Sequence, residues 1–384
     1  MINNYINFCR EIYSEDPIPL HRPYFNKLDK EALINCIDSN FVSTAGKNID
    51  DFEKQTADFT GSNYAISCSS GTTALHSMLF TIGADQGCEI ITQSASFVAT
   101  VNSILYTKAS PVFVDVDRDT MGMCPDSLSN FLRKFSKVKD KILVNKKTGR
   151  RILACLPTHI FGHPCKIKEI QKICDDYGLT LLEDAAEALG SFFKDTHVGT
   201  FGVMGALSFN GNKIITTGGG GMILAREEKI ARRIKHITTT AKIPHPYNFI
   251  HDELGFNYRM PNLNASLGIT QLNKLQKFLS LKRKLASQYR IFFESSNYKF
   301  IDEPEHCRSN FWLNAIECNS EREKIKFIEE TNKQGIFSRP LWKLLHKLAY
   351  LEKFQTFQLE NSEYFEKRVV CLPSSVPNEW MDDD

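Results

Sequence analysis

The chain has 384 residues, of which 42% are hydrophobic and 24% are charged, as in a globular protein with one large domain and one smaller one. Its 47 basic and 45 acidic side chains nearly cancel, and neither end of the chain is strongly basic, so the charge gives no support for a nucleic-acid or membrane-surface partner. No stretch approaches the ~20 apolar residues that are needed to span a bilayer.

The N-terminal sequence MINNYINFCREIYSED has acidic and amide side chains where a signal peptide has its apolar core. The eleven cysteines are scattered and form no CxxC pair, which is typical of reduced, buried thiols. Both observations predict a cytoplasmic protein. A zinc site at His159, His163 and Cys165 is disfavoured, because no second ligand pair follows at the spacing of a zinc finger, and we expect no metal.

Strand and helix patterns alternate from about residue 60 to residue 225. Strands are predicted at 63–68, 89–92, 111–116, 152–158, 205–209 and 220–225. Helices are predicted around 75–82, at 97–107 and at 166–177, where Gly178 ends the last of them. This alternation implies an α/β fold with a mainly parallel sheet that is covered on both faces.

Two regions depart from this alternation. Residues 138–153 predict an inserted hairpin that turns at NKKTG. Beyond about residue 245 the chain predicts one long helix over 260–294, followed by shorter strands such as 311–318. We therefore expect a large α/β domain with an N-terminal arm (1–245) and a smaller C-terminal α+β domain (246–384).

Ligands of an open parallel sheet bind beyond the carboxyl ends of its strands, and four segments fall there. In SSGTT (69–73) a strand ends at a glycine and a helix begins, so the N–H groups near Thr72 and Thr73 suit a phosphate. The alternative is an ordinary capped loop. In LLEDAAEALGS (181–191) a strand delivers Asp184 to the same edge, where it either caps a helix or pairs with a cation.

The third segment, SFNGNKIITTGGGG, places Lys213 in a loop between two strands, with Ser208 before it and four glycines after it. The alternative is a solvated loop lysine. The fourth segment, TQSASFVAT, places Phe97 at the start of a helix, where it either joins the core or stacks on a flat ring.

Together these groups match the needs of pyridoxal 5′-phosphate. Lys213 would hold its aldehyde as a Schiff base, and Asp184 would keep its pyridine nitrogen protonated. The phosphate would be anchored by Thr72, Thr73 and Ser208. A nucleotide P-loop has its glycines before the lysine, and a dinucleotide fingerprint leads into a helix, whereas the glycines here follow Lys213 and lead into a strand.

Several motifs, in order and spacing, resemble the DegT/StrS family of sugar-nucleotide aminotransferases, which have the fold type I of pyridoxal-phosphate enzymes: SGTTALH, SFVATVNSI, HIFGHP, EDAAEALGS, SFNGNKIITTGGGG and GFNYRMPNLNASLG. The resemblance implies that Lys213 shuttles protons, that Asp184 pairs with the pyridinium nitrogen and that Phe97 stacks on the ring. It also implies that Glu187 lies near the ring hydroxyl. A homodimer is implied as well, in which Asn257 reaches the phosphate of the neighbouring subunit's cofactor.

The same resemblance implies glutamate as amino donor and a nucleotide-linked 4-keto-6-deoxy sugar as acceptor, in the synthesis of surface polysaccharide or nonulosonic acid precursors. The motifs are most similar to enzymes that aminate UDP-4-keto-6-deoxy-N-acetylglucosamine. Enzymes for dTDP- or GDP-4-keto-6-deoxyhexoses, of the viosamine or perosamine type, are the alternative. Candidates for contacting the sugar nucleotide are His159, His163, His245, His251 and Arg339. A non-catalytic regulator and a nucleotide-dependent oxidoreductase are more distant alternatives.

Overall fold

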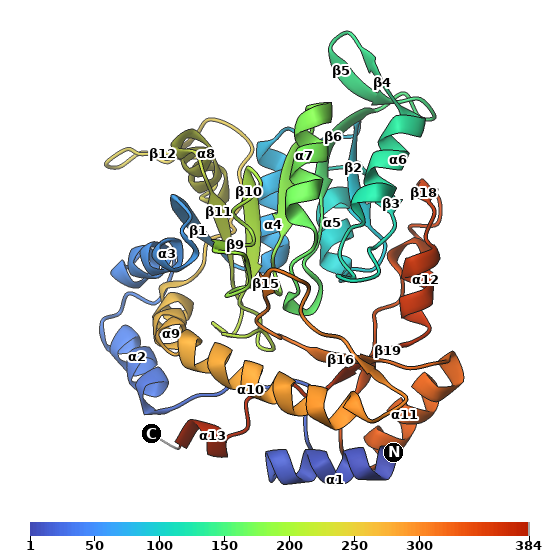
Figure 1. The fold of residues 1–384 in the computed structure, drawn as a ribbon. Coiled ribbons are helices and arrows are strands. Elements are labelled where there is room, and N and C mark those ends of the chain that lie inside the picture. The colour runs from blue at the N-terminus through green and yellow to red at the C-terminus, as the bar shows by residue number, and fades with distance from the viewer. Residues whose placement is uncertain (383–384) are drawn as a thin grey trace.

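A sheet of mostly parallel strands forms the centre of the computed structural model, which describes residues 1–382 (Figure 1). Across the sheet the strands are β1 (Tyr64–Cys68), β11 (Gly221–Ala225), β10 (Met204–Ser208), β7 (Thr180–Asp184), β6 (Arg151–Leu156), β2 (Cys88–Gln93), β3 (Ser110–Val114) and β18 (Thr356–Phe357). On this path β11 alone runs antiparallel to its neighbours. The predicted α/β fold and parallel sheet are confirmed, and each of the six predicted strands lies within two residues of its observed bounds.

Helices cover both faces of this sheet because successive strand residues point to opposite sides. On one face, Ile90 and Leu182 join a core that includes side chains from α4 (Gly71–Thr81), α5 (Val98–Tyr106) and α8 (Glu228–Thr238). On the other face, Ile91 and Leu181 pack with α6 (Pro125–Phe135), α7 (Ile167–Tyr177), α3 (Lys47–Thr60) and α9 (Asn262–Asn273). Gly178 ends α7 in the left-handed conformation, as its position predicts.

The C-terminal part carries a second, antiparallel sheet in the order β14 (Lys299–Phe300), β16 (Asn314–Glu317), β19 (Val369–Leu372) and β17 (Arg339–Pro340). The helix predicted over 260–294 is divided, because α9 ends at Asn273 and α10 (Leu275–Glu294) begins after Lys274, which caps both helices. The N-terminal helix α1 (Ile2–Tyr13) packs beside α10 and α11 (Glu321–Lys333) at the bottom of Figure 1. The predicted boundary between residues 245 and 246 stays a prediction.

The predicted hairpin that turns at NKKTG is confirmed, because β5 (Ile142–Asn145) pairs antiparallel with β6 across this turn through Val144 and Arg151. A second hairpin, which the sequence did not predict, is formed by β4 (Ser136–Lys139) and β5 and turns at Asp140 and Lys141. Short elements complete the structure: α2 (Lys27–Asp38), β8 (Phe192–Phe193), β9 (Thr196–His197), β12 (Lys242–Ile243), β13 (Ile250–His251), β15 (Cys307–Arg308), α12 (Glu360–Glu366) and α13 (Glu379–Asp382). Among residues 1–382, no helix combines the length and the apolar character that a bilayer crossing requires.

Candidate active site

A cavity of about 380 Å³ opens where the carboxyl ends of β1, β7 and β10 meet. The strand register brings these ends together, because Gly221 pairs with both Cys68 and Ser208, and Ala206 pairs with Asp184. The cavity is lined by the predicted residues Thr72, Phe97, Asp184, Glu187, Ser208 and Lys213, and also by Thr100, Thr158, Asn210, Asn212, Trp312 and Trp342. The structure therefore joins four segments that lie far apart in the sequence.

Lys213 lies in the loop between β10 and β11, and its amine is buried between an acid and an indole. Its Nζ is 3.7 Å from Oε1 of Glu187 and 3.8 Å from the ring centroid of Trp312. Burial lowers the pKa of Lys213, and the nearby carboxylates of Glu187 and Asp184 oppose that shift. Because its pKa is lowered, a larger fraction of the Lys213 amine is in the neutral, nucleophilic form than in a solvated lysine.

Asp184 ends β7 with its carboxylate buried against the cavity. Oδ2 accepts a hydrogen bond of 2.6 Å from Oγ1 of Thr100, and Oδ1 accepts one of 3.2 Å from N of Ala186. Burial raises the pKa of Asp184, which these hydrogen bonds and the charge of Lys213 partly offset. No helix follows within 185–191, so Asp184 does not act as a helix cap. A buried acid of this kind is suited to a cation in the cavity.

The loop after β1 presents the N-terminus of α4 to the same cavity. Ser70, Gly71 and Thr72 line the cavity, and they precede the first backbone bond of the helix, from Ala74 N to Ser70 O. The loop lies close to β11, since a Cβ on Gly221 would stand 2.4 Å from Ser70 O. An anion in the cavity would therefore meet free N–H groups and the positive end of the helix dipole.

The prediction for Thr73 needs correction. Its hydroxyl donates a 2.8 Å hydrogen bond to Ser70 O and accepts one from Ser70 N, and its own N–H donates to Oγ of Ser70. Thr73 thus completes the capping box of α4 and is not among the residues that line the cavity. The capped-loop interpretation is confirmed by the capping box of Ser70 and Thr73. The anion site at Thr72, which lines the cavity, stays a prediction.

Phe97 and Glu187 stand at two sides of the cavity. Phe97 precedes α5 and is 50% exposed, so it is not part of the core, and its ring lies 6.1 Å from that of Trp342. Glu187 is buried, and Oε2 accepts a 2.8 Å hydrogen bond from Phe161 N. Burial raises the pKa of Glu187 to about 7, although Lys213 opposes the shift.

Sequence reasoning missed the residues that the C-terminal part contributes. Trp312 donates from Nε1 to Asn212 O at 2.6 Å, which fixes the loop that carries Lys213. Asn310 is fully buried behind the cavity, donates to Glu187 O at 2.9 Å and accepts from Trp312 N at 2.8 Å. Asn310 thereby links the two groups that contact Lys213. The segment SNFWL has no periodic pattern or glycine that marks it, so only its tertiary position identifies it.

The histidines at 159 and 163, predicted to contact the sugar nucleotide, do not line the cavity. His159 is fully buried, with Nε2 3.1 Å from Glu183 Oε2 and Nδ1 accepting from Cys165 N, so both ring nitrogens have partners within the core. His163 is buried edge-on against Phe311. The two partners of His159 leave neither of its ring nitrogens free for a zinc ion.

The remaining predicted residues lie on the surface of this chain, outside the cavity. His251 bonds Thr240 O at 2.7 Å, and His245 and His251 belong to the exposed region of β12 and β13. Asn257 is exposed beside Thr239. Arg339 donates to Asn332 Oδ1 at 2.8 Å at the edge of the small sheet, which removes the reason to place it at the cavity.

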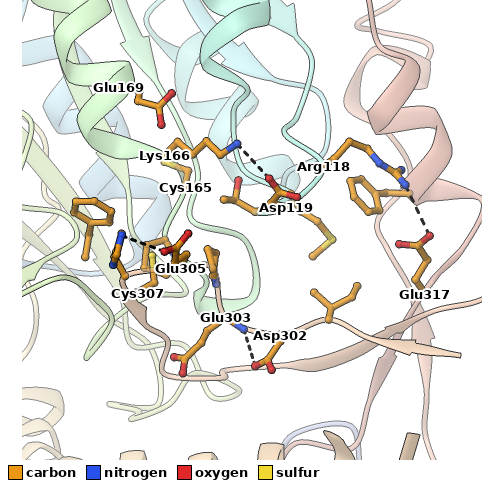
Figure 2. Close-up of a pocket in the computed structure, with 18 of the residues that line it drawn as sticks. Arg118, Asp119, Cys165, Lys166, Glu169, Asp302, Glu303, Glu305, Cys307 and Glu317 are labelled. Carbon is orange, nitrogen blue, oxygen red and sulfur yellow. Dashed lines mark hydrogen bonds and ion pairs between the residues drawn. The ribbon is translucent and has the colours of Figure 1, made fainter. Parts of the chain in front are cut away.

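A larger cavity of about 610 Å³ lies between the loop after β3, the start of α7 and the segment that leads to β15 (Figure 2). Several of its charged groups are paired, as Lys166 with Asp117 at 2.7 Å and Arg118 with Glu317 at 3.9 Å. Burial raises the pKa of Cys307 to about 12, so its thiol stays protonated. This cavity offers no nucleophile comparable with Lys213.

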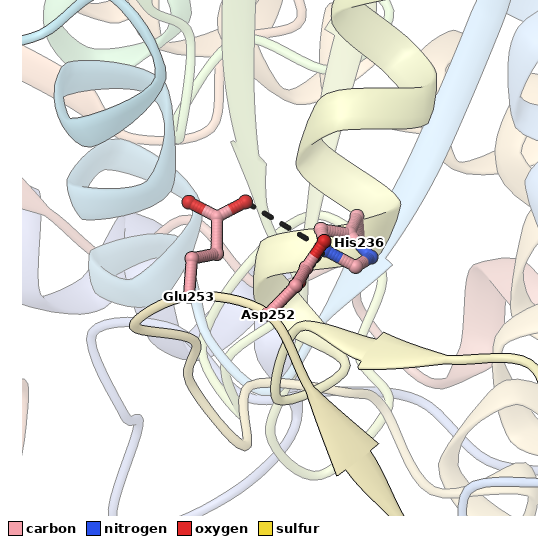
Figure 3. Close-up of side chains that lie close together, drawn as sticks. All are labelled: His236, Asp252 and Glu253. Atoms are coloured by element: carbon pink, nitrogen blue, oxygen red, sulfur yellow. Dashed lines mark hydrogen bonds and ion pairs between the residues drawn. The ribbon is translucent and has the colours of Figure 1, made fainter.

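His236, Asp252 and Glu253 form the one cluster of metal-ligand type found among the described residues (Figure 3). His236 Nε2 lies 2.7 Å from Asp252 Oδ1, and the guanidinium of Arg233 binds both carboxylate oxygens of Glu253. Because Arg233 already neutralises Glu253, the cluster is an exposed ion-pair network.

The cavity at β1, β7 and β10 fits a flat, phosphate-bearing cation. Its volume suits a small cofactor. The helix N-terminus with Thr72 and Ser208 suits the anionic part of such a ligand. The buried Asp184 suits a protonated ring nitrogen, and the amine of Lys213 suits a carbonyl carbon. Pyridoxal 5′-phosphate carries these three groups on one ring.

Residues 23–379 match the DegT/DnrJ/EryC1/StrS aminotransferase family. The chain is 33% identical to the GDP-perosamine synthase of Escherichia coli O157:H7 over 95% of each chain, and 33% identical to that of Vibrio cholerae over 93% of this chain and 94% of the relative. The crystal structure of Helicobacter pylori PseC, an aminotransferase of pseudoaminic acid biosynthesis, superimposes with a TM-score of 0.84 over 94% of each chain at 24% identity, which supports the fold. The chain therefore belongs to the DegT/DnrJ/EryC1/StrS family and is a pyridoxal-phosphate-dependent sugar aminotransferase.

Proposed function

We propose that this aminotransferase moves an amino group from glutamate to the keto group of a GDP-linked 4-keto-6-deoxyhexose, as a step in the synthesis of a polysaccharide precursor. The observation that carries the chemistry is the single cavity shared by Lys213, Asp184 and the N-terminus of α4. The choice of nucleotide rests on the two GDP-perosamine synthases, each 33% identical to the chain. This choice replaces the UDP-linked N-acetyl sugar expected from the motifs with the GDP-linked alternative.

Pyridoxal phosphate supplies a ring that withdraws electrons from the carbon bearing the transferred nitrogen. In our proposal, Thr72, Ser208 and the N–H groups that open α4 hold its phosphate. Asp184 holds the proton on the ring nitrogen, and that positive charge would in turn lower the carboxylate's raised pKa. Phe97 covers one face of the ring.

Lys213 is proposed to move the proton at the reacting carbon in both halves of the reaction. A base must be free of its own proton near neutral pH, and burial shifts the pKa of Lys213 in that direction. Glu187 lies 3.7 Å from the amine and has a pKa of about 7, so it can stabilise the ammonium form when the proton resides on Lys213. Trp312 shields the amine from water on the opposite side.

We also propose a cytoplasmic homodimer whose active sites form across the interface. Large apolar side chains are exposed on two regions of the surface, around α2 and around β12 and β13: Leu28, Ile37, Phe41, Tyr247, Phe249 and Leu254. A monomer seldom leaves such a set in water, whereas an interface buries it. Asn257, His245 and His251 belong to this region and would face the partner's cavity.

The test is glutamate-dependent amination of GDP-, UDP- and dTDP-linked 4-keto-6-deoxy sugars by the purified enzyme. We expect the highest kcat/KM with a GDP-linked substrate. A clear preference for the UDP-linked N-acetyl sugar would instead favour the substrate that the sequence motifs predict. Failure to aminate any of the three sugar nucleotides would contradict the proposal. The variant Lys213→Ala should bind cofactor without the covalent link that borohydride otherwise fixes at residue 213, and it should lack turnover.

A further inference from the structure

The hairpin β4–β5 and the residues that flank it, 133–151, form a strongly basic projection from the sheet, at the top of Figure 1. This segment, called here the basic hairpin, has nine basic side chains and one acidic one, a net charge of +8, whereas the whole chain carries +2 and the other residues together carry −6. All nine are exposed: Arg133, Lys134, Lys137, Lys139, Lys141, Lys146, Lys147, Arg150 and Arg151. Within residues 1–382, the recorded ion pairs include none of them.

The base of the basic hairpin is firmly attached to the sheet. Glu89 in β2 is buried and accepts hydrogen bonds of 2.7 Å from Asn145 Nδ2 and 2.7 Å from Thr148 Oγ1. Asn145 also donates to Gln355 Oε1 at 2.9 Å, and Leu143 joins the main core. The like charges are therefore held together on an ordered element, although their mutual repulsion opposes it. A surface selected for solubility alone mixes both signs of charge.

Two aliphatic side chains lie among the lysines at the tip. Val138 is 72% exposed and Ile142 is 43% exposed, and they lie on opposite faces of the hairpin, because Val138 pairs with Leu143 and Ile142 pairs with Lys139. Cations surrounding an exposed aliphatic tip fit the surface of a membrane with anionic lipids, where headgroups attract the lysines and the aliphatic groups enter the acyl boundary. Single-stranded nucleic acids favour aromatic stacking beside the cations, whereas the one aromatic residue of the basic hairpin, Phe135, is half-buried against Phe131 and Phe357.

We propose that the basic hairpin docks this enzyme peripherally on a membrane surface that carries anionic phospholipids. The hairpin joins the sheet where β6 begins, through the pair Val144 and Arg151, and hence at the amino ends of the parallel strands. The catalytic cavity opens at their carboxyl ends, so docking leaves it free. The net charge of the whole chain is near zero and does not reveal this local excess of basic side chains, which lies in the middle of the sequence and not at its ends.

The experiment measures co-sedimentation of the cofactor-loaded enzyme with vesicles of phosphatidylcholine alone or mixed with phosphatidylserine, at low and at physiological salt. We expect binding that requires phosphatidylserine and weakens with salt. The test variant combines Lys137→Gln, Lys139→Gln, Lys141→Gln and Lys146→Gln. The matched control combines four exposed lysines elsewhere, Lys108→Gln, Lys229→Gln, Lys333→Gln and Lys367→Gln. The test variant should bind at least about tenfold more weakly than the control, and both should keep basal aminotransferase activity.

A second variant separates a lipid surface from other polyanions. Val138→Ser with Ile142→Ser keeps every charge and should weaken vesicle binding while leaving weak, salt-sensitive retention on heparin unchanged. Equal vesicle binding by the test and control variants would overturn the proposal. Tight binding of double-stranded DNA that the double serine variant retains, without vesicle binding, would also overturn it and assign the hairpin to nucleic acid.

Discussion

The amine of Lys213 and the carboxyl group of Glu187 share one buried space, and burial shifts the proton affinity of each toward its neutral form. Separated by 3.7 Å, they partly restore each other's charge. Two ionisable groups with opposed shifts are the arrangement that acid–base chemistry at neutral pH requires. The pH dependence of the protein should therefore report on Glu187.

Glu187→Gln should alter how stability depends on pH in the cofactor-free protein. The folded-state pKa of Glu187 is about 7 against an ordinary value of 4.5, so between these pH values the native state binds more protons than the unfolded chain. The free energy of unfolding thus falls as pH rises through this window, by up to about 3 kcal/mol for this group. Urea unfolding at pH 4.5 and pH 7.5 should show a smaller difference for the glutamine variant, and an unchanged difference would contradict the shifted pKa.

Asp184→Asn should retain the fold and lose most activity. The amide keeps a hydrogen-bonding oxygen for Thr100 but supplies no negative charge to a ring nitrogen. Removing one preorganised electrostatic group from a buried site typically lowers kcat by about 100- to 1000-fold. Single-turnover measurements with glutamate would show this loss in the chemical step. A variant that turns over normally would mean that Asp184 does not hold the ring nitrogen.

At the scale of segments, the cavity depends on a network that ends in Asn310. Its side chain binds the carbonyls of Glu187 and Leu189 and the N–H of Trp312. The segment from the C-terminal part is thereby joined to the segment after β7. The hydrogen bonds of Asn310 therefore fix the positions of Glu187 and Trp312, the two residues that contact Lys213.

Asn310→Ala should destabilise the protein and also change its catalytic pH profile. Three buried backbone groups lose their partner at a cost of about 1–3 kcal/mol each, so the total loss should be at least about 3 kcal/mol. The control Asn332→Ala removes an amide that likewise bonds two carbonyls, those of Ile328 and Ser338, away from the cavity. Both variants should lose stability, but only Asn310→Ala should move the pKa seen in kcat against pH. If kcat depends on pH in the same way in both variants, the role of Asn310 is purely structural.

Patterns in short segments of the sequence predicted the strands and the loops that follow them, because neighbouring residues determine where these elements begin and end. The strands before Asp184 and around Lys213 are short apolar runs that end in glycine or polar residues, so their ends could be located from the sequence. The break at Lys274 lies in an uninterrupted helical pattern and depends on tertiary packing, as α9 packs on α3 and α2. His159 has a loop-like context in sequence, yet Glu183 holds it inside the core. The contribution of Trp312 likewise arises only from the folded arrangement.

At the scale of the whole molecule, the exposed aromatic residues around β12 and β13 argue for a second subunit. Tyr247→Ser with Phe249→Ser removes two side chains that are each 80% exposed in the single chain. Each aromatic anchor of an interface contributes about 2 kcal/mol, and both subunits of a homodimer lose the two anchors, so the dimer Kd should rise by a factor of about 10⁶. Sedimentation velocity over a concentration series would measure this. Ile291→Ser with Ile325→Ser is the control on distant exposed sites, and an equal effect of both pairs would argue against this interface.

The position of α1 has a consequence for how the protein is made. Its apolar face, with Tyr5 and Cys9, is buried only by α10 and α11, and Cys9 contacts Tyr289 across 280 residues of sequence. At a synthesis rate of about 5–20 residues per second, that face stays uncovered on the ribosome for roughly 15–60 s. This helix emerges well before the helices on which it docks, so nascent chains expose a hydrophobic surface that chaperones can recognise during this interval.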